Sequence, residues 1–178
     1  MGGPGNLGDG VAVLGRWLLM LLLGLAGCGT ARTPPSRGVP EVGGALSCVP
    51  YARARSGLSL RGDAWQWWEA AAARYERGQA PRPGSVLVLM RTSRLPMGHV
   101  AVVSRLVSDR EIRVDHANWA PGGSGTRGRV ARDQAVADIS PGNDWSLVRV
   151  WYPPSGALGA TAFPAYGFIH PTVVTAGR

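Results

Sequence analysis

The sequence predicts one α+β domain, in which helices come first along the chain and β-strands follow. Before Gly84 the apolar residues recur at helical spacing, whereas after it they alternate with polar residues and β-branched types become common. A length of 178 residues suits one domain with a sizeable core, and 45% apolar with 17% charged residues is an ordinary globular mixture. We therefore expect N-terminal helices packed on an antiparallel sheet, one layer of each.

Residues 1–27 are predicted to be an export signal. Arg16 precedes ten almost uniformly apolar residues, 17–26, a run too short to cross a bilayer, which takes about 20. The sequence LAGC that ends at Cys28 resembles a bacterial lipobox, which implies cleavage before Cys28 and lipidation of its thiol. The alternative is a plain secretory signal, with Cys28 left as a thiol or paired with Cys48.

Residues 28–46 are expected to form the lipidated cysteine and a flexible linker, because they mix Gly, Pro, Ser and Thr without an apolar period. The compact domain is then residues 47–170, followed by a tail of residues 171–178. The residue after Cys28 is Gly29. In Gram-negative envelopes an Asp at this position resembles a signal for retention in the inner membrane, and its absence favours the outer membrane, although a Gram-positive cell is the alternative. We therefore expect an exported lipoprotein that faces the periplasm, anchored to the outer membrane.

The charged residues of the chain exclude several catalytic mechanisms and favour certain partners. All 19 basic residues are Arg, which excludes a Schiff-base lysine, a Ser-Lys dyad and the lysine of a Walker phosphate loop. A net charge of +8 favours anionic surroundings such as wall polymers or lipid head groups. Nucleic acid is not expected as a partner, because the chain is exported and carries no recognisable nucleic-acid module. No cofactor is implied.

The expected elements follow from caps and periodicity. A short helix begins at Cys48 and ends before Gly57. A second helix is predicted from the Asp63 cap to the Gly78 stop, with one buried face. That face comprises Ala64, Trp68, Ala71, Ala72 and Tyr75. Strands are predicted at residues 85–90, 99–107, 111–118 and 144–152, with a hairpin turn at 108–110 and a Gly-rich loop at 120–128.

Few side chains are suited to nucleophilic chemistry. With Cys28 acylated, Cys48 is the remaining thiol, and the histidines are His99, His116 and His170. A thiol at a helix start lies near free N–H groups and the positive end of the helix dipole, both of which stabilise the thiolate. Cys48 is therefore the candidate nucleophile.

Strand parity selects partners for this thiol. On residues 111–118 alternation places His116 and Asn118 on the inward face and points Asp115 away. If the hairpin pairs this strand with the preceding one, His99 at the start of that strand becomes a neighbour of His116. Cys48, His99 and His116 then fill the roles of nucleophile, base and orienting group, with Asn118 as an alternative orienting group or a substrate ligand.

Two other interpretations of the same residues stay open. In one, Cys48 is buried and both histidines are satisfied structural residues. In the other, Cys48, His99 and His116 bind zinc and leave a fourth position for water. No close ligand pair of the CxxC or HExxH kind supports the zinc site, so no metal is predicted.

The domain resembles a known family in the stretches SCVPYARARSGLSLRGDAWQWWEAA, PRPGSVLVLM, GHVAVVSRLV, IRVDHANW and WYPPSGALGATAFPAYGFI. In that order they are similar to the CHAP domain (cysteine, histidine-dependent amidohydrolase/peptidase). The resemblance implies a papain-like fold and amide cleavage through a thioester, with Cys48 as nucleophile and His99 as base and then acid. His116 departs from the family pattern, in which many members carry an acidic residue there, so Asn118 is expected to carry more of the orienting role.

The resemblance also suggests how substrate is held. The Cys48 backbone N–H is expected to contribute to an oxyanion hole. Trp119, beside the site, is a candidate for stacking on a sugar, whereas Trp65, Trp67 and Trp68 are expected mainly in the core.

The expected function is that of a lipid-anchored peptidoglycan hydrolase, either an N-acetylmuramoyl-L-alanine amidase or an endopeptidase. The main alternative is a catalytically silent CHAP-like module that binds the wall. A small structural lipoprotein with a buried Cys48, and an amidase acting on an exported peptide or a competitor's wall, are further alternatives. Whether a protein activator takes part is left open by the sequence.

Overall fold

The computed structural model describes residues 47–121 and 126–173, and every structural statement below concerns these two ranges. They belong to the second of two compact units, which spans Arg37–Arg178. The expected signal, lipidation site and linker at residues 1–46, and the centre of the Gly-rich loop, lie outside the described residues. Within the described ranges no helix is both long enough and apolar enough to span a bilayer.

The first predicted helix is confirmed. Helix α1 spans Cys48–Ser56 and starts after an extended Ser47, with φ −98° and ψ 156°. It ends at Gly57, whose left-handed φ of 77° turns the chain and whose N–H donates to the Arg53 carbonyl. Cys48 is thus the first residue of the helix.

The second predicted helix is wrong beyond its first turns. A 3₁₀ turn, η1, spans Ala64–Gln66, and a short helix, α2, spans Trp67–Ala70. Ala73 then adopts a left-handed φ of 57°, and strand β1, Tyr75–Gly78, pairs with strand β8 at the other end of the chain. Alanines 70–73 favour a helix but bury little side chain, so sheet pairing decides the conformation of the residues after them.

The strands are all paired antiparallel, as predicted. After β1 they are β2 Val86–Leu89, β3 His99–Ser108, β4 Glu111–Trp119, β5 Thr126–Asp138, β6 Leu147–Tyr152, β7 Ala157–Leu158 and β8 Phe163–Val173. A second 3₁₀ turn, η3, spans Pro153–Ser155 between β6 and β7. Strands β1, β5, β7 and β8 were not predicted, and β5 begins inside the expected Gly-rich loop.

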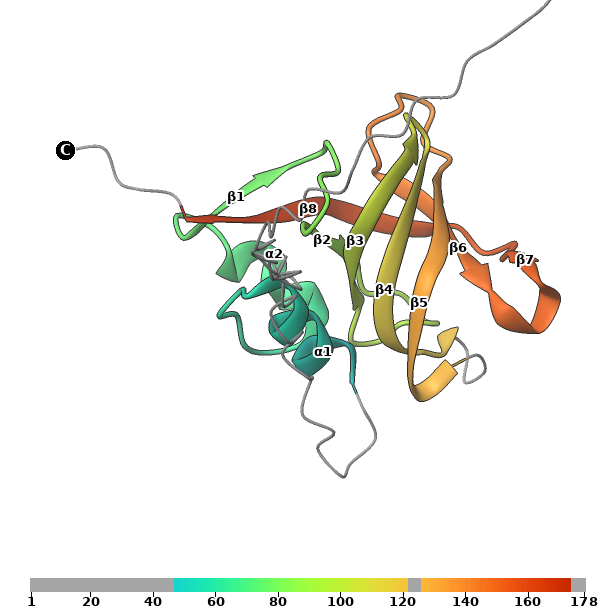
Figure 1. Ribbon diagram of the computed structural model, residues 1–178, viewed down its shortest axis with the longest axis horizontal. Helices are drawn as coiled ribbons and strands as arrows, with labels where there is room; N and C mark the ends of the chain where they lie inside the picture. The colour runs from blue at the N-terminus through green and yellow to red at the C-terminus, as the bar shows by residue number, and fades with distance from the viewer. Residues whose placement is uncertain (1–46, 122–125, 174–178) are drawn as a thin grey trace, which may run out of the picture. The chain divides into compact units, whose positions relative to one another are not determined.

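The sheet is closed rather than a single open layer. Its order is β1-β8-β2-β3-β4-β5-β6-β7, and β8 also pairs with β6, so strands from β2 to β6 form a barrel with β8. Figure 1 shows the long strand β8 in red, reaching from β1 toward β6, with α1 and α2 together on one side of the strands. The antiparallel sheet is as expected, but it forms a barrel accompanied by few helices instead of one layer of each.

Two apolar cores follow from the alternation of side chains along β2 and β3. The first lies within the barrel and comprises Leu87, Leu89, Leu95, Ala101, Val103, Ile112, Val114, Trp119, Val136, Trp145, Val148, Val150, Phe163, Ala165 and Phe168. The second joins the helices to the outer face and comprises Ala52, Leu58, Leu60, Ala64, Trp67, Ala71, Val86, Val88, Val100, Val102 and Ile169. Helix α1 is thus held against the barrel wall by burial of apolar surface.

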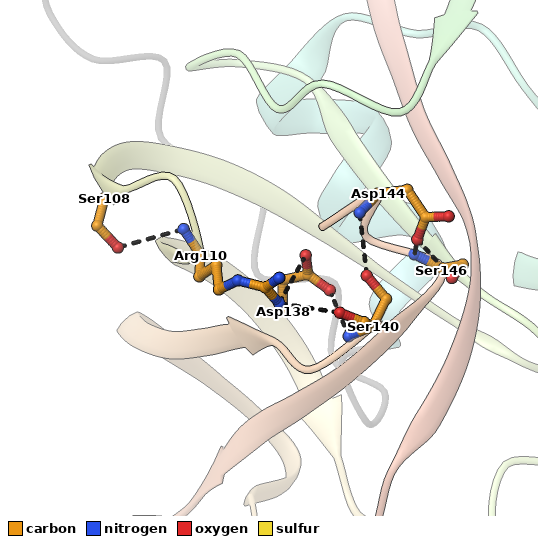
Figure 2. A network of polar contacts seen from close by, with 6 residues as sticks. All are labelled: Ser108, Arg110, Asp138, Ser140, Asp144 and Ser146. Atoms are coloured by element: carbon orange, nitrogen blue, oxygen red, sulfur yellow. Dashed lines mark hydrogen bonds and ion pairs between the residues drawn. The ribbon is translucent and has the colours of Figure 1, made fainter. Parts of the chain in front are cut away.

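A polar network closes the end of the barrel where β3 turns into β4 (Figure 2). Arg110, in that turn, donates to the Ser140 carbonyl at 2.9 Å and contacts the Asp138 carboxylate at 3.7 Å. Asp138 accepts from the Ser140 N–H at 2.8 Å, and the Ser140 hydroxyl accepts from the Asp144 N–H at 3.0 Å. These bonds fix the β3–β4 turn to the segment between β5 and β6.

Candidate active site

A cleft of about 710 Å³ opens at the other end of β3 and β4, beside the start of α1. Three residues singled out from the sequence line it: Cys48, His99 and Asn118. The rest of the lining comprises Ser47, Val49, Pro50, Gly62, Asp63, Ala64, Ser93, Arg94, Leu95, Pro96, Met97, Gly98, Ala120 and Arg127. The fold thus brings the candidate nucleophile and base to one solvent-accessible space.

Cys48 is a free, half-buried thiol at the start of α1. Burial raises its pKa above the ordinary value, and this outweighs the hydrogen bonds from the backbone of Val100 and of the helix start, which lower it. The negative charge of Asp63 raises the pKa further. The helix start favours the thiolate, as expected, but desolvation is the larger effect, so the pKa of the thiol is raised in this state of the site.

Gly98 fixes where His99 enters β3. Its φ is +66°, and a Cβ at this position would lie 2.7 Å from the Leu89 carbonyl oxygen and 2.9 Å from the Trp65 nitrogen. The Trp65 N–H donates to the Met97 carbonyl at 3.3 Å, so the loop before His99 is held tightly against η1. Only glycine combines this backbone conformation with so close an approach.

His99 and His116 are neighbours, as strand parity predicted. The distance from Nε2 of His99 to Nδ1 of His116 is 3.2 Å, and the two rings meet edge to face. They are 3% and 1% exposed, respectively. Since Nε2 of His99 faces His116, Nδ1 of His99 is the ring nitrogen left for the cleft.

Both imidazoles are neutral at ordinary pH. Burial, and secondarily the electrostatic effect of the neighbouring His116, holds the pKa of His99 well below its usual value. Burial lowers the pKa of His116 to about 3. The Nε2 atom of His116 is buried and has no hydrogen-bond partner among the described residues, so this ring is satisfied on the His99 side alone.

Asn118 reaches the cleft by a different route from the one strand parity predicts. It adopts a left-handed φ of 56°, where the pairing of β4 with β5 shifts register between Ala117 and Trp119. Its side-chain Oδ1 accepts a hydrogen bond from the Gly128 N–H at 2.8 Å. Among the described residues, His116 is therefore the side chain that hydrogen-bonds the His99 ring, and Asn118 anchors β5 beside the cleft.

Asp115 points away from the histidines, as predicted, and ties α1 to the sheet. Its carboxylate contacts Arg55 of α1 at 3.3 Å and Arg132 of β5 at 3.8 Å. It also accepts a hydrogen bond from the Asp133 N–H at 3.0 Å. This acid therefore helps to hold the helix that carries Cys48.

Trp119 is not among the residues that line the cleft, and its candidate role in stacking on a sugar stays a prediction. It is 1% exposed, and its ring centre lies 4.8 Å from that of His99 and 5.4 Å from that of His116. Its Nε1 donates to the Trp151 carbonyl at 3.1 Å. The left-handed turn at Asn118 directs the next side chain inward, where it packs behind the two imidazoles.

The other tryptophans near the helices are structural, as expected. Trp67 is fully buried in the helix-side core. Trp65 lies under the Arg91 guanidinium, at 5.0 Å, and Trp68 stacks on Tyr166 with ring centres 5.9 Å apart. None of the three lines the cleft.

No group of three His, Cys, Asp or Glu side chains within the described ranges is arranged to hold a metal ion. The cleft does contain charged residues that the sequence gave no reason to select, namely Arg94, Arg127 and Asp63. Asp63 was noticed only as a helix cap. The two arginines belong to no motif, so their place in the cleft could be found only from the fold.

Comparisons with known proteins show what the chain is similar to. None of the curated proteins compared with the chain matches it. Among solved structures, a crystal structure of an N-acetylmuramoyl-L-alanine amidase from Staphylococcus aureus is similar, with 22% identity and a TM-score of 0.42. That match covers 60% of this chain and 30% of the amidase chain. The profile of the CHAP domain matches residues 39–118, which include Cys48, His99, His116 and Asn118, so this part of the chain is similar to the CHAP domain.

Proposed function

We propose that this protein is a peptidoglycan hydrolase that cuts peptide amide bonds, with Cys48 as nucleophile and His99 as general base. One observation carries the proposal: Cys48 and His99 line the same cleft, while Nε2 of His99 is held 3.2 Å from Nδ1 of His116. The match of residues 39–118 to the CHAP domain supports hydrolysis of peptidoglycan. The helix that carries Cys48, packed against the barrel that carries His99, is compatible with the papain-like arrangement that the family implies.

The reaction starts from a neutral pair. Because burial raises the pKa of Cys48 and lowers that of His99, the thiol keeps its proton until substrate binds. As the sulfur attacks the carbonyl carbon, the thiol proton moves to Nδ1 of His99. The C–N bond then breaks, His99 returns the proton to the leaving amine, and a thioester remains. His99 next deprotonates a water molecule, which attacks the thioester and releases the acid and the thiol.

His116 is proposed to orient His99. With Nδ1 of His99 free to accept a proton, its Nε2–H donates to Nδ1 of His116, which fixes the ring tautomer. A neutral His116 supplies no negative charge, which fits the low pKa of His99. The backbone N–H of Cys48, at the start of α1, is proposed as one donor of the oxyanion hole.

We also propose that the chain is a lipoprotein that is exported, cleaved before Cys28 and anchored to the outer membrane. The lipobox-like sequence before Cys28, and Gly29 after it, support this proposal. Residues 28–46 would then link the anchor to the catalytic domain. The test is mass spectrometry of the mature N-terminus with membrane fractionation: acylation and outer-membrane recovery are expected, and Cys28→Ala should abolish both.

The activity is tested with the purified full chain, its Cys48→Ala variant and isolated sacculi. Release of peptides cut from muramic acid indicates an amidase, and cuts within the stem or cross-bridge indicate an endopeptidase. Cys48→Ala should reduce release by at least about 10⁴-fold, because loss of a covalent nucleophile removes the reaction path. Cys28→Ala is the matched control, since it replaces the other cysteine of the chain, to which the proposal gives no catalytic role, and should leave release unchanged.

Two outcomes would contradict the hydrolase proposal. Equal release by wild type and Cys48→Ala would assign the activity to another group or a contaminant. Binding of sacculi by both proteins without release by either would favour the silent wall-binding module instead. Mass spectrometry of the fragments and a sedimentation assay of binding together separate these cases.

A further inference from the structure

Two arginines on the walls of the cleft have no counter-ion among the described residues. Arg94 comes from the loop before β3, and Arg127 comes from the start of β5. Both side chains are exposed. Seven other arginines of the described ranges do form ion pairs with carboxylates. They are Arg55, Arg77, Arg82, Arg105, Arg110, Arg113 and Arg132. Arg94 and Arg127 therefore keep their guanidinium groups available to a ligand.

The charge in the cleft is unbalanced on the positive side. Asp63 is the one carboxylate among the described lining residues, and it lies near enough to Cys48 to raise the pKa of that thiol. It forms no ion pair with Arg94 or Arg127 within the described ranges. Since Cys48 and His99 are neutral, two positive charges face one negative charge around the reacting groups.

This arrangement suits a negatively charged substrate. A guanidinium presents a planar fork of donors that matches a carboxylate, and charge-assisted hydrogen bonds of this kind are stronger than neutral ones. We propose that Arg94 and Arg127 bind a free carboxylate of the substrate peptide, close to the amide that Cys48 attacks. This inference deepens the proposed function and rests on it for the identity of the substrate. Peptidoglycan peptides carry carboxyl groups that are either free or amidated, and the site prefers the free form.

Arg94 also lines a second hollow, which gives it the larger part in this recognition. That hollow, about 310 Å³, has Arg94 in its wall together with Trp119, Val150 and Phe163. A peptide that extends from the catalytic cleft into this space passes Arg94. Arg94 therefore contacts a ligand in either hollow, whereas Arg127 lines the catalytic cleft alone.

The preference is measured by binding, so that it does not depend on hydrolysis. The full chain with Cys48→Ala is titrated calorimetrically with a synthetic muramyl peptide whose carboxyls are free, and with the same peptide amidated. We expect the free form to bind about tenfold more tightly, as one charge-assisted contact provides. Arg94→Gln, introduced together with Cys48→Ala, should remove most of this tenfold difference in affinity. Arg127→Gln should remove a smaller part of it. Arg149→Gln is the matched control, because Arg149 is exposed on β6 and lines neither hollow.

Several results would overturn the inference: equal affinity for the two peptides, no detectable binding of either, or an equal effect of Arg149→Gln. All three arginines are exposed, so none of the three substitutions should change the thermal unfolding temperature. Thermal unfolding of each variant therefore shows directly whether it is folded. Hydrolysis of the free peptide by the protein with Cys48 intact tests the proposed function separately. If the free peptide is bound more tightly but is not cut, the hydrolase proposal is contradicted and the carboxylate site is not. If the peptide is cut but the two forms bind equally, the carboxylate site is contradicted and the hydrolase proposal is not.

Discussion

The two ends of the barrel both bury polar side chains, but they satisfy them differently. At the end drawn in Figure 2, Asp138 is 4% exposed, accepts from the Ser140 N–H at 2.8 Å and contacts Arg110 at 3.7 Å. At the cleft end, His116 is 1% exposed and its Nε2 has no partner among the described residues. One end thus surrounds a charge with donors, while the other leaves a buried ring nitrogen unpaired.

This difference separates stability from function. A buried polar atom without a hydrogen bond costs about 1–3 kcal/mol, so the His116 arrangement does not stabilise the fold. In the proposed mechanism its effect is to give His99 a defined orientation, while burial keeps that imidazole neutral, as a proton acceptor must be. Backbone strain does not distinguish the ends, because Asn118 at one and Asn143 and Trp145 at the other all have positive φ. The two ends therefore differ in whether their buried polar groups are hydrogen-bonded.

Among the predicted effects, that of His116→Leu on activity is the largest. We expect kcat/KM for peptidoglycan peptides to fall about 100-fold or more, because His99 loses the group that fixes its tautomer. The free energy of unfolding should change by about 1 kcal/mol or less, since the variant removes one unpaired nitrogen, Nε2 of His116, and leaves another, Nε2 of His99. Kinetics and urea unfolding of the same preparations measure both quantities.

His116→Gln is the informative companion, because an amide oxygen can accept the bond from His99. Partial recovery of kcat/KM in this variant would support the orienting role. A large loss of stability in His116→Leu, with full activity per folded molecule, would place His116 with the structural residues instead.

Asp138→Ala examines the opposite end and should give the reverse result. Removing the carboxylate leaves the buried Ser140 N–H without its acceptor and Arg110 without its ion-pair partner, so we expect a loss of about 2–3 kcal/mol of stability. The folded fraction should hydrolyse substrate at the wild-type rate. Asp138→Asn keeps an oxygen acceptor for Ser140 and should lose less. An unchanged urea midpoint in Asp138→Ala would show that the network does not stabilise the barrel.

Local features of this site were predictable from sequence. The helix that starts at Cys48 has a helix-start residue before it and a glycine after it, and both signals act within one element. The adjacency of His99 and His116 follows from alternation along two strands joined by a short hairpin, so it needs no knowledge of the rest of the fold. Asp115 pointing away follows from the same rule.

The features that were missed depend on contacts between distant parts of the chain. Strand β8 closes the barrel by pairing with β1, β2 and β6, and no local signal specifies three partners for one strand. The same pairing ends the second helix early. The burial of Trp119 depends on one left-handed residue, Asn118, which breaks the alternation along β4. The raised pKa of Cys48 reflects burial, which only the packing of α1 determines.

The smallest expected effect is on the pH dependence of stability. Burial lowers the pKa of His116 from an ordinary 6.5 to about 3 in the folded protein. Below the ordinary value the unfolded chain binds a proton that the folded chain does not, so stability is fully present above it and is lost as pH falls toward 3. From pH 6 to pH 5 this residue should cost about 1 kcal/mol, measured by urea unfolding. His116→Leu should show a correspondingly weaker loss over the same interval, whereas Asp138→Asn should keep the wild-type slope there. Equal slopes in wild type and His116→Leu would mean that the buried ring already takes up its proton in the folded state, and the contrast between the two ends of the barrel would fail.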